Sequence, residues 1–232
     1  MRLALIGHGK MGRALEALAA ERGHEVVAVV TGAENPGGRA ITPERLSGAE
    51  VALEFTGPRA AVANLLRLAE LGIPAVTGTT GWLSELPLVV AAVTAHHSAL
   101  LHSPNFSLGV QLFLRAARDL AARLAGRAEF DAWITEAHHA AKADAPSGTA
   151  RRLQEALRKS DPARAFPITS IRAGYLPGTH MIGYDAPHET IRLSHEARGR
   201  EAFAAGALAA AEWIRGRRGV FTFEQMLFGD EL

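Results

Sequence analysis

A glycine loop near the N-terminus constrains the fold more than any other segment of the chain. Gly7, Gly9 and Gly12 follow a short apolar run, residues 3–6, and precede apolar residues at helical spacing. The first glycine permits a tight turn, the second lets a pyrophosphate approach the backbone, and the third lets the helix pack closely on its strand. The pattern predicts a dinucleotide site with its phosphates on the helix N-terminus.

Predicted strands and helices alternate through the first hundred residues. After the glycine loop, we expect strands at 26–30, 51–55, 74–77 and 100–102, with helices at 61–71 and 86–94. This alternation is typical of the α/β class and predicts a Rossmann-like, doubly wound parallel sheet.

The pattern changes after residue 106. We expect an amphipathic helix at 108–124, a strand at 130–137, a helix from Ser147 to about residue 159, strands at 168–173, 180–185 and 189–195, a helix at 200–215, and a tail at 216–232. Consecutive strands without intervening helices predict a second, α+β domain. We therefore assign residues 1–106 plus 204–232 to a dinucleotide-binding domain and 107–203 to a substrate-binding domain.

The composition excludes several classes of protein. Among 232 residues, 25 Lys and Arg balance 24 Asp and Glu, so neither a nucleic-acid nor a membrane-surface partner is expected. Cysteine is absent, which excludes a disulfide scaffold and a cysteine nucleophile and suits a cytoplasmic enzyme. No apolar run approaches the ~20 residues that span a bilayer, and no signal peptide is recognised.

Two further loops are expected at the carboxyl ends of the parallel strands, where such sheets bind ligands. One follows the fourth strand and the other the fifth, although either could be an ordinary strand-ending turn. With the glycine loop, they complete the predicted cofactor-binding set: Gly7, His8, Gly9, Lys10, Met11, Gly12, Gly78, Thr79, Thr80, Ser103, Pro104, Asn105 and Phe106.

Cofactor preference depends on the end of the second strand. An acidic residue usually binds the adenosine ribose there, but this chain has Thr31 and Gly32, with Glu34 further out in the loop. Lys10 and Arg39 could attract a 2′-phosphate, or could simply be solvated charges. The hypothesis is that NADPH is used at least as well as NADH.

Residues 136–150, EAHHAAKADAPSGTA, carry the candidate catalytic groups. His138 could give or take a proton near neutral pH, and His139 could bind a carboxylate. Lys142 could neutralise substrate charge or protonate a carbanion. A helix start presents backbone amides suited to a carboxylate, at Ser147, Gly148 and Thr149. Together these groups predict a site that holds and protonates a small dianion.

A zinc site is the alternative for these histidines. Ligands could come from His138, His180, His188 and His195, but no pair has the helical HExxH spacing and cysteine is absent. The other alternative is structural, with the histidines decorating a loop and Ser147 serving only as a helix cap.

The chain resembles the dihydrodipicolinate reductase family over essentially its whole length. The most specific match is the run from Glu136 to Thr149, which is close to the family signature. Further matches are Gly7–Gly12, EFT at 54–56, GTTG at 78–81, PNF at 104–106, RAG at 172–174 with GTH at 178–180, and SHEA at 194–197 with Arg200 and Phe203.

The resemblance implies a reductase that transfers hydride from NADH or NADPH to a cyclic dicarboxylate in diaminopimelate and lysine biosynthesis, giving tetrahydrodipicolinate. It implies proton transfer by His138 and Lys142, and substrate binding by His139, Gly148 and Thr149. It also implies a homotetramer associated through the sheet of the second domain. The missing acidic residue after the second strand departs from the family, so cofactor preference is not carried over.

Two rival functions stay open at the level of the sequence. The first is a related NAD(P)-dependent dehydrogenase of another small acid, which substrate profiling would separate. The second is a module that senses nicotinamide nucleotides, which would not need His138, His139 and Lys142 together.

Overall fold

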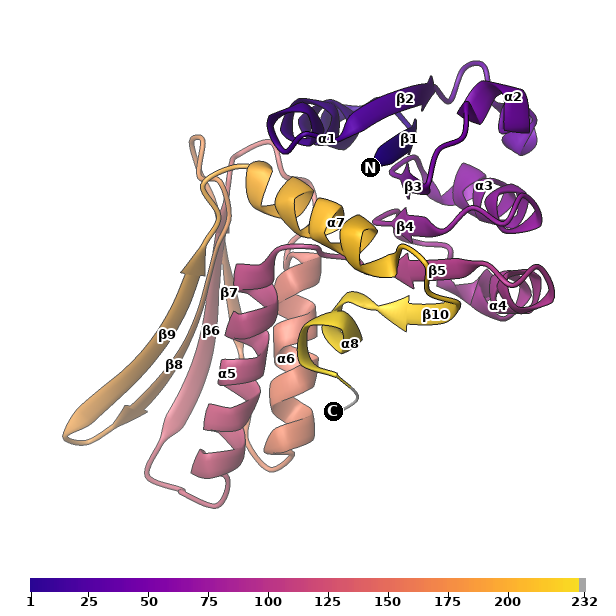
Figure 1. The fold of residues 1–232 in the computed structure, drawn as a ribbon. Coiled ribbons are helices and arrows are strands. Elements are labelled where there is room, and N and C mark those ends of the chain that lie inside the picture. Colours follow the sequence, from indigo (N-terminus) through magenta and orange to yellow (C-terminus); the bar gives the residue numbers. More distant parts are fainter. Residues whose placement is uncertain (230–232) are drawn as a thin grey trace. The chain divides into compact units, whose positions relative to one another are not determined.

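The computed structural model describes residues 1–229, and residues 230–232 of the predicted first domain lie outside the described part. The chain divides into two compact units (Figure 1). Unit 1 comprises Met1–Ser107 and the chain from Phe203 onward, and unit 2 comprises Leu108–Ala202. The roles assigned to the two parts of the chain stay predictions.

Unit 1 contains a six-stranded sheet in which every pair of neighbours is parallel, in the order β10-β5-β4-β3-β1-β2. Its strands are β1 (Arg2–Ile6), β2 (Glu25–Val30), β3 (Val51–Glu54), β4 (Ala75–Thr77), β5 (Ala99–His102) and β10 (Gly219–Thr222). The chain runs from β1 to β2 on one side and returns to β3 on the other. The resulting switch point lies at the carboxyl ends of β1 and β3, where such sheets bind ligands.

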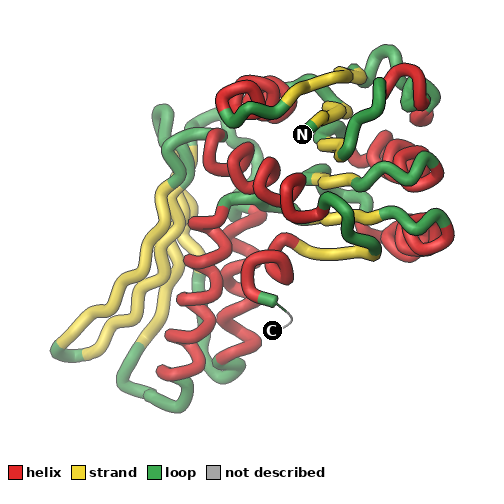
Figure 2. Tube along the Cα trace, in the orientation of Figure 1, coloured by secondary structure: helices red, strands yellow, loops and turns green. Residues whose placement is uncertain are grey.

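Helices cover both faces of this sheet (Figure 2). They are α1 (Lys10–Glu21), α2 (Pro43–Leu46), α3 (Pro58–Glu70), α4 (Leu86–Ala95), α7 (Glu201–Ile214) and α8 (Phe223–Phe228), with 3-10 turns η1 (Pro36–Gly38) and η2 (Leu83–Glu85). Alternate residues of β1 enter different cores, because Leu3 and Leu5 pack with α1, α7 and α8 whereas Ala4 and Ile6 pack with α3 and α4. The predicted doubly wound sheet is confirmed.

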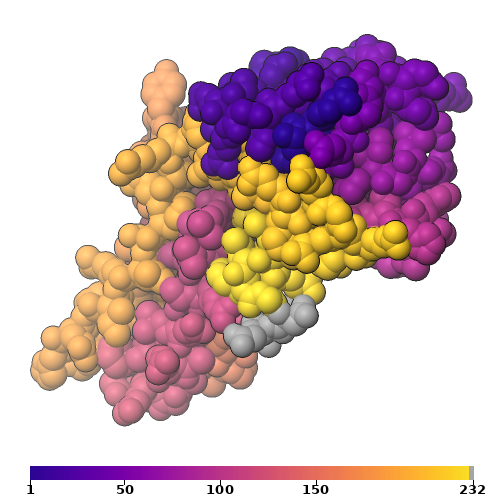
Figure 3. All heavy atoms as spheres, in the orientation of Figure 1, coloured from indigo at the N-terminus to yellow at the C-terminus, as the bar shows by residue number. Residues whose placement is uncertain are grey.

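The predicted tail at 216–232 is wrong for its described residues. Residues 219–222 form β10, which pairs with β5, and a capping box between Thr222 and Gln225 begins α8. In Figure 3 the golden to yellow C-terminal part of the chain, which includes α7, adjoins the indigo N-terminal residues of the same unit. A strand of four residues is too short to show a periodic pattern. Its partner β5 also lies more than a hundred residues away in the sequence, so no nearby segment indicates the pairing.

Unit 2 is a four-stranded mixed sheet, ordered β7-β6-β8-β9, with two helices on one face (Figure 1). Its elements are α5 (Leu108–Leu124), β6 (Asp131–His138), α6 (Gly148–Ser160), β7 (Ile168–Arg172), β8 (Thr179–Ala186) and β9 (Glu189–Glu196). Only the β6–β7 pair is parallel. Phe113 and Leu153 of the helices pack on Ile182 and Tyr184 of the sheet, so the predicted α+β class is confirmed. Within the described chain, no helix is both long and apolar enough to cross a bilayer.

Candidate active site

The glycine loop has the close backbone contacts that its pattern predicts. Gly7 has a φ of +100°, and a Cβ on it would lie 2.3 Å from the Phe55 carbonyl oxygen. A Cβ on Gly12 would lie 2.3 Å from the Gly7 carbonyl oxygen. No acidic residue occupies the first turn of α1, so the partial positive charge of that helix end is available to a phosphate.

A pocket of about 390 Å³ adjoins this loop at the switch point between β1 and β3. It brings together the glycine loop, the segment after β3 and the segment after β4. The lining residues are Gly9, Lys10, Met11, Phe55, Thr56, Gly57, Pro58, Gly78, Thr79 and Thr80. The candidate set drawn from the sequence omits residues 55–58, although their position after a buried parallel strand was a usable signal. Because Gly9 and Lys10 at the α1 N-terminus line this pocket, the pocket is suited to a phosphate-bearing ligand.

The remaining predicted cofactor residues occupy other settings. His8 Nε2 lies 2.8 Å from Glu16 Oε2. Ser103 and Pro104 line a smaller cavity of about 50 Å³ together with Thr79 and Thr80. The ring of Phe106 is buried in the core and contacts the rings of Phe55 and Phe223. The loop after β5 therefore has only its backbone and its first polar residues to offer a cofactor.

Glu34 returns to the end of β2 although it lies several residues beyond it in the sequence. Its Oε1 accepts a hydrogen bond from the Thr31 backbone N–H at 2.7 Å and lies 2.7 Å from Arg45 Nη2. The Thr31 hydrogen bonds and the Arg45 guanidinium hold the pKa of this exposed carboxyl below its usual value. The Glu34 carboxylate, paired with a cation, thus lies at the end of β2, where the sequence itself has Thr31 and Gly32.

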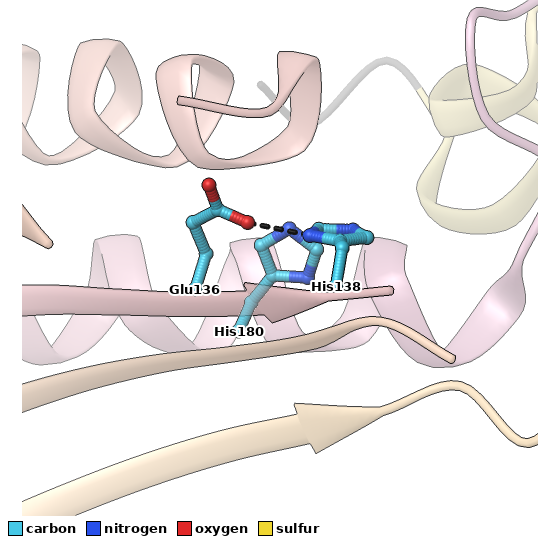
Figure 4. A group of neighbouring side chains, drawn as sticks. All are labelled: Glu136, His138 and His180. Carbon is cyan, nitrogen blue, oxygen red and sulfur yellow. Dashed lines mark hydrogen bonds and ion pairs between the residues drawn. The ribbon is translucent and has the colours of Figure 1, made fainter. Parts of the chain in front are cut away.

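In unit 2, Glu136 and His138 lie two residues apart on one face of β6 and point toward each other (Figure 4). Glu136 Oε2 is 2.5 Å from His138 Nδ1. Arg172 donates to both carboxylate oxygens, from Nη1 to Oε2 at 3.0 Å and from Nη2 to Oε1 at 2.6 Å. Arg172 reaches this position because β7 pairs with β6 in a register that sets it beside His138.

The charges in this cluster follow from the hydrogen bonds. Burial raises the pKa of the Glu136 carboxyl, but hydrogen bonds from Arg172, Ser170 and His138 outweigh burial and lower it to about 2. The carboxylate is ionised, so the shared proton stays on His138 Nδ1. Burial lowers the pKa of His138 despite the opposing Glu136 charge. At neutral pH His138 therefore presents a free Nε2 lone pair.

A glycine keeps that ring nitrogen accessible from β8. Gly178 has a φ of +131°, and a Cβ there would lie 3.2 Å from His138 Nε2. Any larger residue would be strained and would crowd His138 Nε2.

His180 completes the buried cluster. It lies on β8 opposite Glu136, and its ring centroid is 5.2 Å from that of His138. His180 Nε2 is 3.0 Å from Ser147 Oγ, which also accepts from the Ala150 N–H and so caps α6. Burial, with the His138 charge next in size, lowers the pKa of His180 to about 4.

The predicted carboxylate site lies at the start of α6. The Ser147 N–H already donates to Glu136 Oε1 at 3.3 Å, and its hydroxyl is engaged by His180. Gly148 is exposed and Thr149 half-buried, and the first turn of α6 holds no acidic residue. The free N-terminal amides of this helix are suited to a carboxylate.

Lys142 lies in the turn after β6. Its Nζ is 2.6 Å from Asp144 Oδ1, and its backbone N–H donates to the His139 carbonyl at 3.1 Å. Arg172 Nη2 donates to the Asp144 carbonyl at 2.5 Å, so the guanidinium that holds Glu136 also fixes this turn. The Lys142 charge contributes to the lowered pKa of His138. The predicted His138 and Lys142 are thus brought together.

A metal could use part of this cluster. Among the described residues, ligand atoms of Glu136, His138 and His180 all lie within 4.8 Å of one another. Both oxygens of Glu136 already accept from Arg172, whose charge opposes a cation. His188, in the predicted zinc set, lies in the exposed turn between β8 and β9. The arrangement fits proton transfer better than metal binding.

Comparison with known families covers both halves of the chain. The model described as "Dihydrodipicolinate reductase, N-terminus" matches residues 1–106. The model described as "Dihydrodipicolinate reductase, C-terminus" matches residues 109–227.

Individual relatives agree with these matches. A 4-hydroxy-tetrahydrodipicolinate reductase of Christiangramia forsetii is 33% identical over 240 residues, covering 98% of each chain. One of Rhodopseudomonas palustris is 38% identical over 259 residues, covering 94% of this chain and 93% of that protein. The structure titled dipicolinate-bound dihydrodipicolinate reductase from Paenisporosarcina sp. TG-14 is similar in fold, with a TM-score of 0.81, 22% identity, and coverage of 97% of this chain and 99% of that one.

Proposed function

The chain belongs to the dihydrodipicolinate reductase family, and on this premise we propose how its residues carry out the reduction. It is an NAD(P)H-dependent oxidoreductase with the activity of a 4-hydroxy-tetrahydrodipicolinate reductase, which serves diaminopimelate and lysine biosynthesis. The substrate is a cyclic dicarboxylate and the product is tetrahydrodipicolinate.

The observation that carries the residue assignment is the chain of contacts from Arg172 through Glu136 to His138. A buried carboxylate fixes the tautomer of the imidazole, and the guanidinium keeps the carboxylate ionised. One ring nitrogen is left to exchange a proton with a substrate. The same role division, an orienting acid behind a proton-transferring histidine, is common in catalytic sites.

The cofactor belongs in the unit 1 pocket. Gly9, Lys10 and Met11 would hold its phosphates at the α1 N-terminus, and Thr56 and Thr79 would contact it further along the strand ends. When bound, the dihydronicotinamide supplies the hydride. We propose that NADH and NADPH are both used.

The substrate's two carboxylates need cations and amides. Gly148 and Thr149 offer backbone amides at the α6 N-terminus, His139 offers an imidazole, and Lys142 an ammonium. A bound dianion raises the pKa of His138, because negative charge nearby favours the imidazolium. After hydride transfer, the carbanion or enamine left on the substrate takes a proton from His138 Nε2 or from Lys142 Nζ.

We also propose a cytoplasmic homotetramer. The face of the unit 2 sheet opposite α5 and α6 carries Trp133 and Ile171, and Ile171 is 43% exposed. The Trp133 ring covers Gly183, where a Cβ would come within 2.3 Å of it. Apolar side chains such as these on a sheet face support association with further copies of the chain.

A coupled assay tests the activity and the role of His138. The condensation product of aspartate semialdehyde and pyruvate is supplied, and the loss of 340 nm absorbance is followed with NADPH and with NADH. The wild-type chain is expected to oxidise the cofactor rapidly, and His138→Gln to lower kcat by ~10²–10⁴-fold because a general acid is lost. The kcat of Lys142→Met measures the contribution of Lys142, the second proposed proton donor.

His188→Gln is the matched control, because His188 is exposed in the β8–β9 turn. It should retain wild-type turnover. Unchanged turnover in His138→Gln would refute the assignment of His138. No oxidation of either cofactor by a chain that binds nucleotide would point to a different small acid as substrate.

A further inference from the structure

We propose that Glu54 is a positioning residue that holds two loops of the nucleotide pocket, those after β3 and β4, in one arrangement with the loop after β2. Glu54 ends β3 and is fully buried. The inference rests on the proposed binding of a nicotinamide cofactor in that pocket, and it assigns Glu54 no contact with the cofactor. It differs from the roles of Gly7 and Gly12, which act through close backbone packing.

The Glu54 carboxylate is satisfied by neutral donors. Oε2 accepts from Thr77 Oγ1 at 2.6 Å, and Oε1 accepts from Thr56 Oγ1 and from Asn64 Nδ2, the latter at 3.3 Å. Within residues 1–229, no lysine, arginine or histidine forms an ion pair with it. A buried carboxylate without a cation is costly unless its hydrogen bonds are well made, so its position calls for a role that a neutral side chain cannot fill.

The first two loops are joined through threonines. Thr56 and Thr79 line the pocket, and the Thr56 N–H donates to Thr79 Oγ1 at 3.0 Å. Thr77, which lies beside Glu54 in the β3–β4 register, accepts from the Thr79 N–H at 3.3 Å. Because the Thr77 hydroxyl proton goes to Glu54, its lone pairs are turned toward Thr79.

The third loop is reached through two asparagines. Asn64 Oδ1 accepts from Asn35 Nδ2 at 2.9 Å, and Asn35 Oδ1 accepts from the Ala40 N–H at 2.9 Å. Asn35 and Asn64 are both buried. The loop after β2, which contains Glu34, is thereby connected to the same carboxylate as the loops after β3 and β4.

A carboxylate suits this position because it only accepts hydrogen bonds. Both threonine hydroxyls and the Asn64 amide must donate to it, which leaves Asn64 Oδ1 to accept from Asn35. An amide of the same shape would present a donor to one of the hydroxyls or to Asn64 and reverse that bond. Glu54→Gln therefore changes the polarity of the network while keeping its volume.

The test is direct nucleotide binding to the full chain, measured by calorimetry with NADH and with NADPH. Glu54→Gln is expected to raise Kd about tenfold for both cofactors, by the same factor, because the loops that Glu54 connects are held less firmly. With saturating cofactor, kcat should change by less than about twofold and the KM for the dicarboxylate should stay unchanged, since the residues of unit 2 are untouched.

Thr77→Val provides a second route to the same network. Thr77 is buried and does not line the pocket, and the substitution removes a donor to Glu54. It should weaken both cofactors in the same direction, Thr77→Ser should restore binding, and the double variant should be non-additive. Val93→Ala, in the core of the same unit, is the control for general destabilisation and should bind with wild-type Kd.

Wild-type Kd in Glu54→Gln and in Thr77→Val would overturn the inference, as would equal weakening in Val93→Ala. A wild-type chain that binds neither nucleotide would overturn the proposed cofactor itself, and the positioning role with it. Weaker binding of one cofactor alone would contradict a common effect of Glu54 on the loops of the pocket.

Discussion

At the scale of single residues, Glu34 places a negative charge at the end of β2, within a pair with Arg45. A 2′-phosphate would be repelled by the carboxylate and attracted by Arg45 once that carboxylate is removed. Glu34→Ala is therefore expected to raise the ratio of kcat/KM for NADPH to that for NADH about 3- to 10-fold. The ratio is measured by steady-state kinetics with each cofactor.

Glu44→Gln is the control for this prediction. Glu44 lies in the nearby α2 and its side chain carries the same charge, but its carboxylate interacts with the Thr42 side chain, whereas that of Glu34 accepts from the Thr31 backbone. Its cofactor ratio should match that of the wild type. An unchanged ratio in Glu34→Ala would show that the carboxylate does not face the ribose.

Residue-level prediction from the sequence is possible where the chemistry is local, and the roles assigned in this way stay predictions. The glycine loop and the His138–Lys142 segment each lie within one stretch, so spacing alone indicated them. Arg172 is part of a family match in the sequence but received no role there, because it is 36 residues from Glu136 and reaches it only through the parallel pairing of β7 with β6. The only role predicted for His180 was that of a zinc ligand, because its contact with Ser147 depends on the register of β8.

At the scale of elements, His180 in the sheet of unit 2 makes the free energy of unfolding depend on pH. The pKa of His180 is lowered to about 4, mainly by burial. Since the unfolded chain protonates its histidine near pH 6.5, this residue contributes stability that is present above pH 6.5 and lost as the pH falls toward 4. Glu136, whose pKa is lowered to about 2, contributes stability that is present above about 4.5 and lost at lower pH.

His180→Gln is expected to flatten the upper part of this dependence. The free energy of urea unfolding would be measured at several pH values between 7.5 and 4, and the wild type should lose more stability over that range than the variant. His188→Gln, in an exposed turn, should follow the wild-type curve. Parallel curves for His180→Gln and the wild type would contradict the assignment.

Elements with their own periodicity were predicted within a few residues, whereas β10 was missed. The helix predicted at 108–124 is α5 (Leu108–Leu124), because its amphipathic pattern extends over several turns. The four residues of β10 are all half-buried and show no alternation. Their strand conformation depends on hydrogen bonds to β5, which no local pattern reports.

At the scale of the whole molecule, the open face of the unit 2 sheet sets the proposed oligomeric state. Ile171→Glu places a charge on that face and is expected to dissociate the tetramer, because a buried unpaired carboxylate destabilises an interface. Mass by light scattering with size exclusion measures the outcome. Leu88→Glu, at a 50% exposed position of α4 in unit 1, is the matched control and should retain the wild-type mass.

A tetrameric mass for Ile171→Glu would place the interface elsewhere, and a monomeric wild type would remove the proposal.

The two-unit division follows from a change of pattern visible in the sequence, from alternating strands and helices to consecutive strands. The sequence did not indicate that β6 and β7 pair in parallel. These two strands are connected through α6, as the parallel strands of the first sheet are connected through helices, whereas the strands that follow come directly one after another.

The late position of β10 in the chain has a consequence for biosynthesis. All of unit 2 leaves the ribosome before the strand that completes the sheet of unit 1. Until residues 219–222 emerge, β5 is an unpaired edge whose backbone groups can pair with another nascent chain. A chain whose synthesis ends within α7 would therefore contain all of unit 2 but would leave the β5 edge of unit 1 exposed to aggregation.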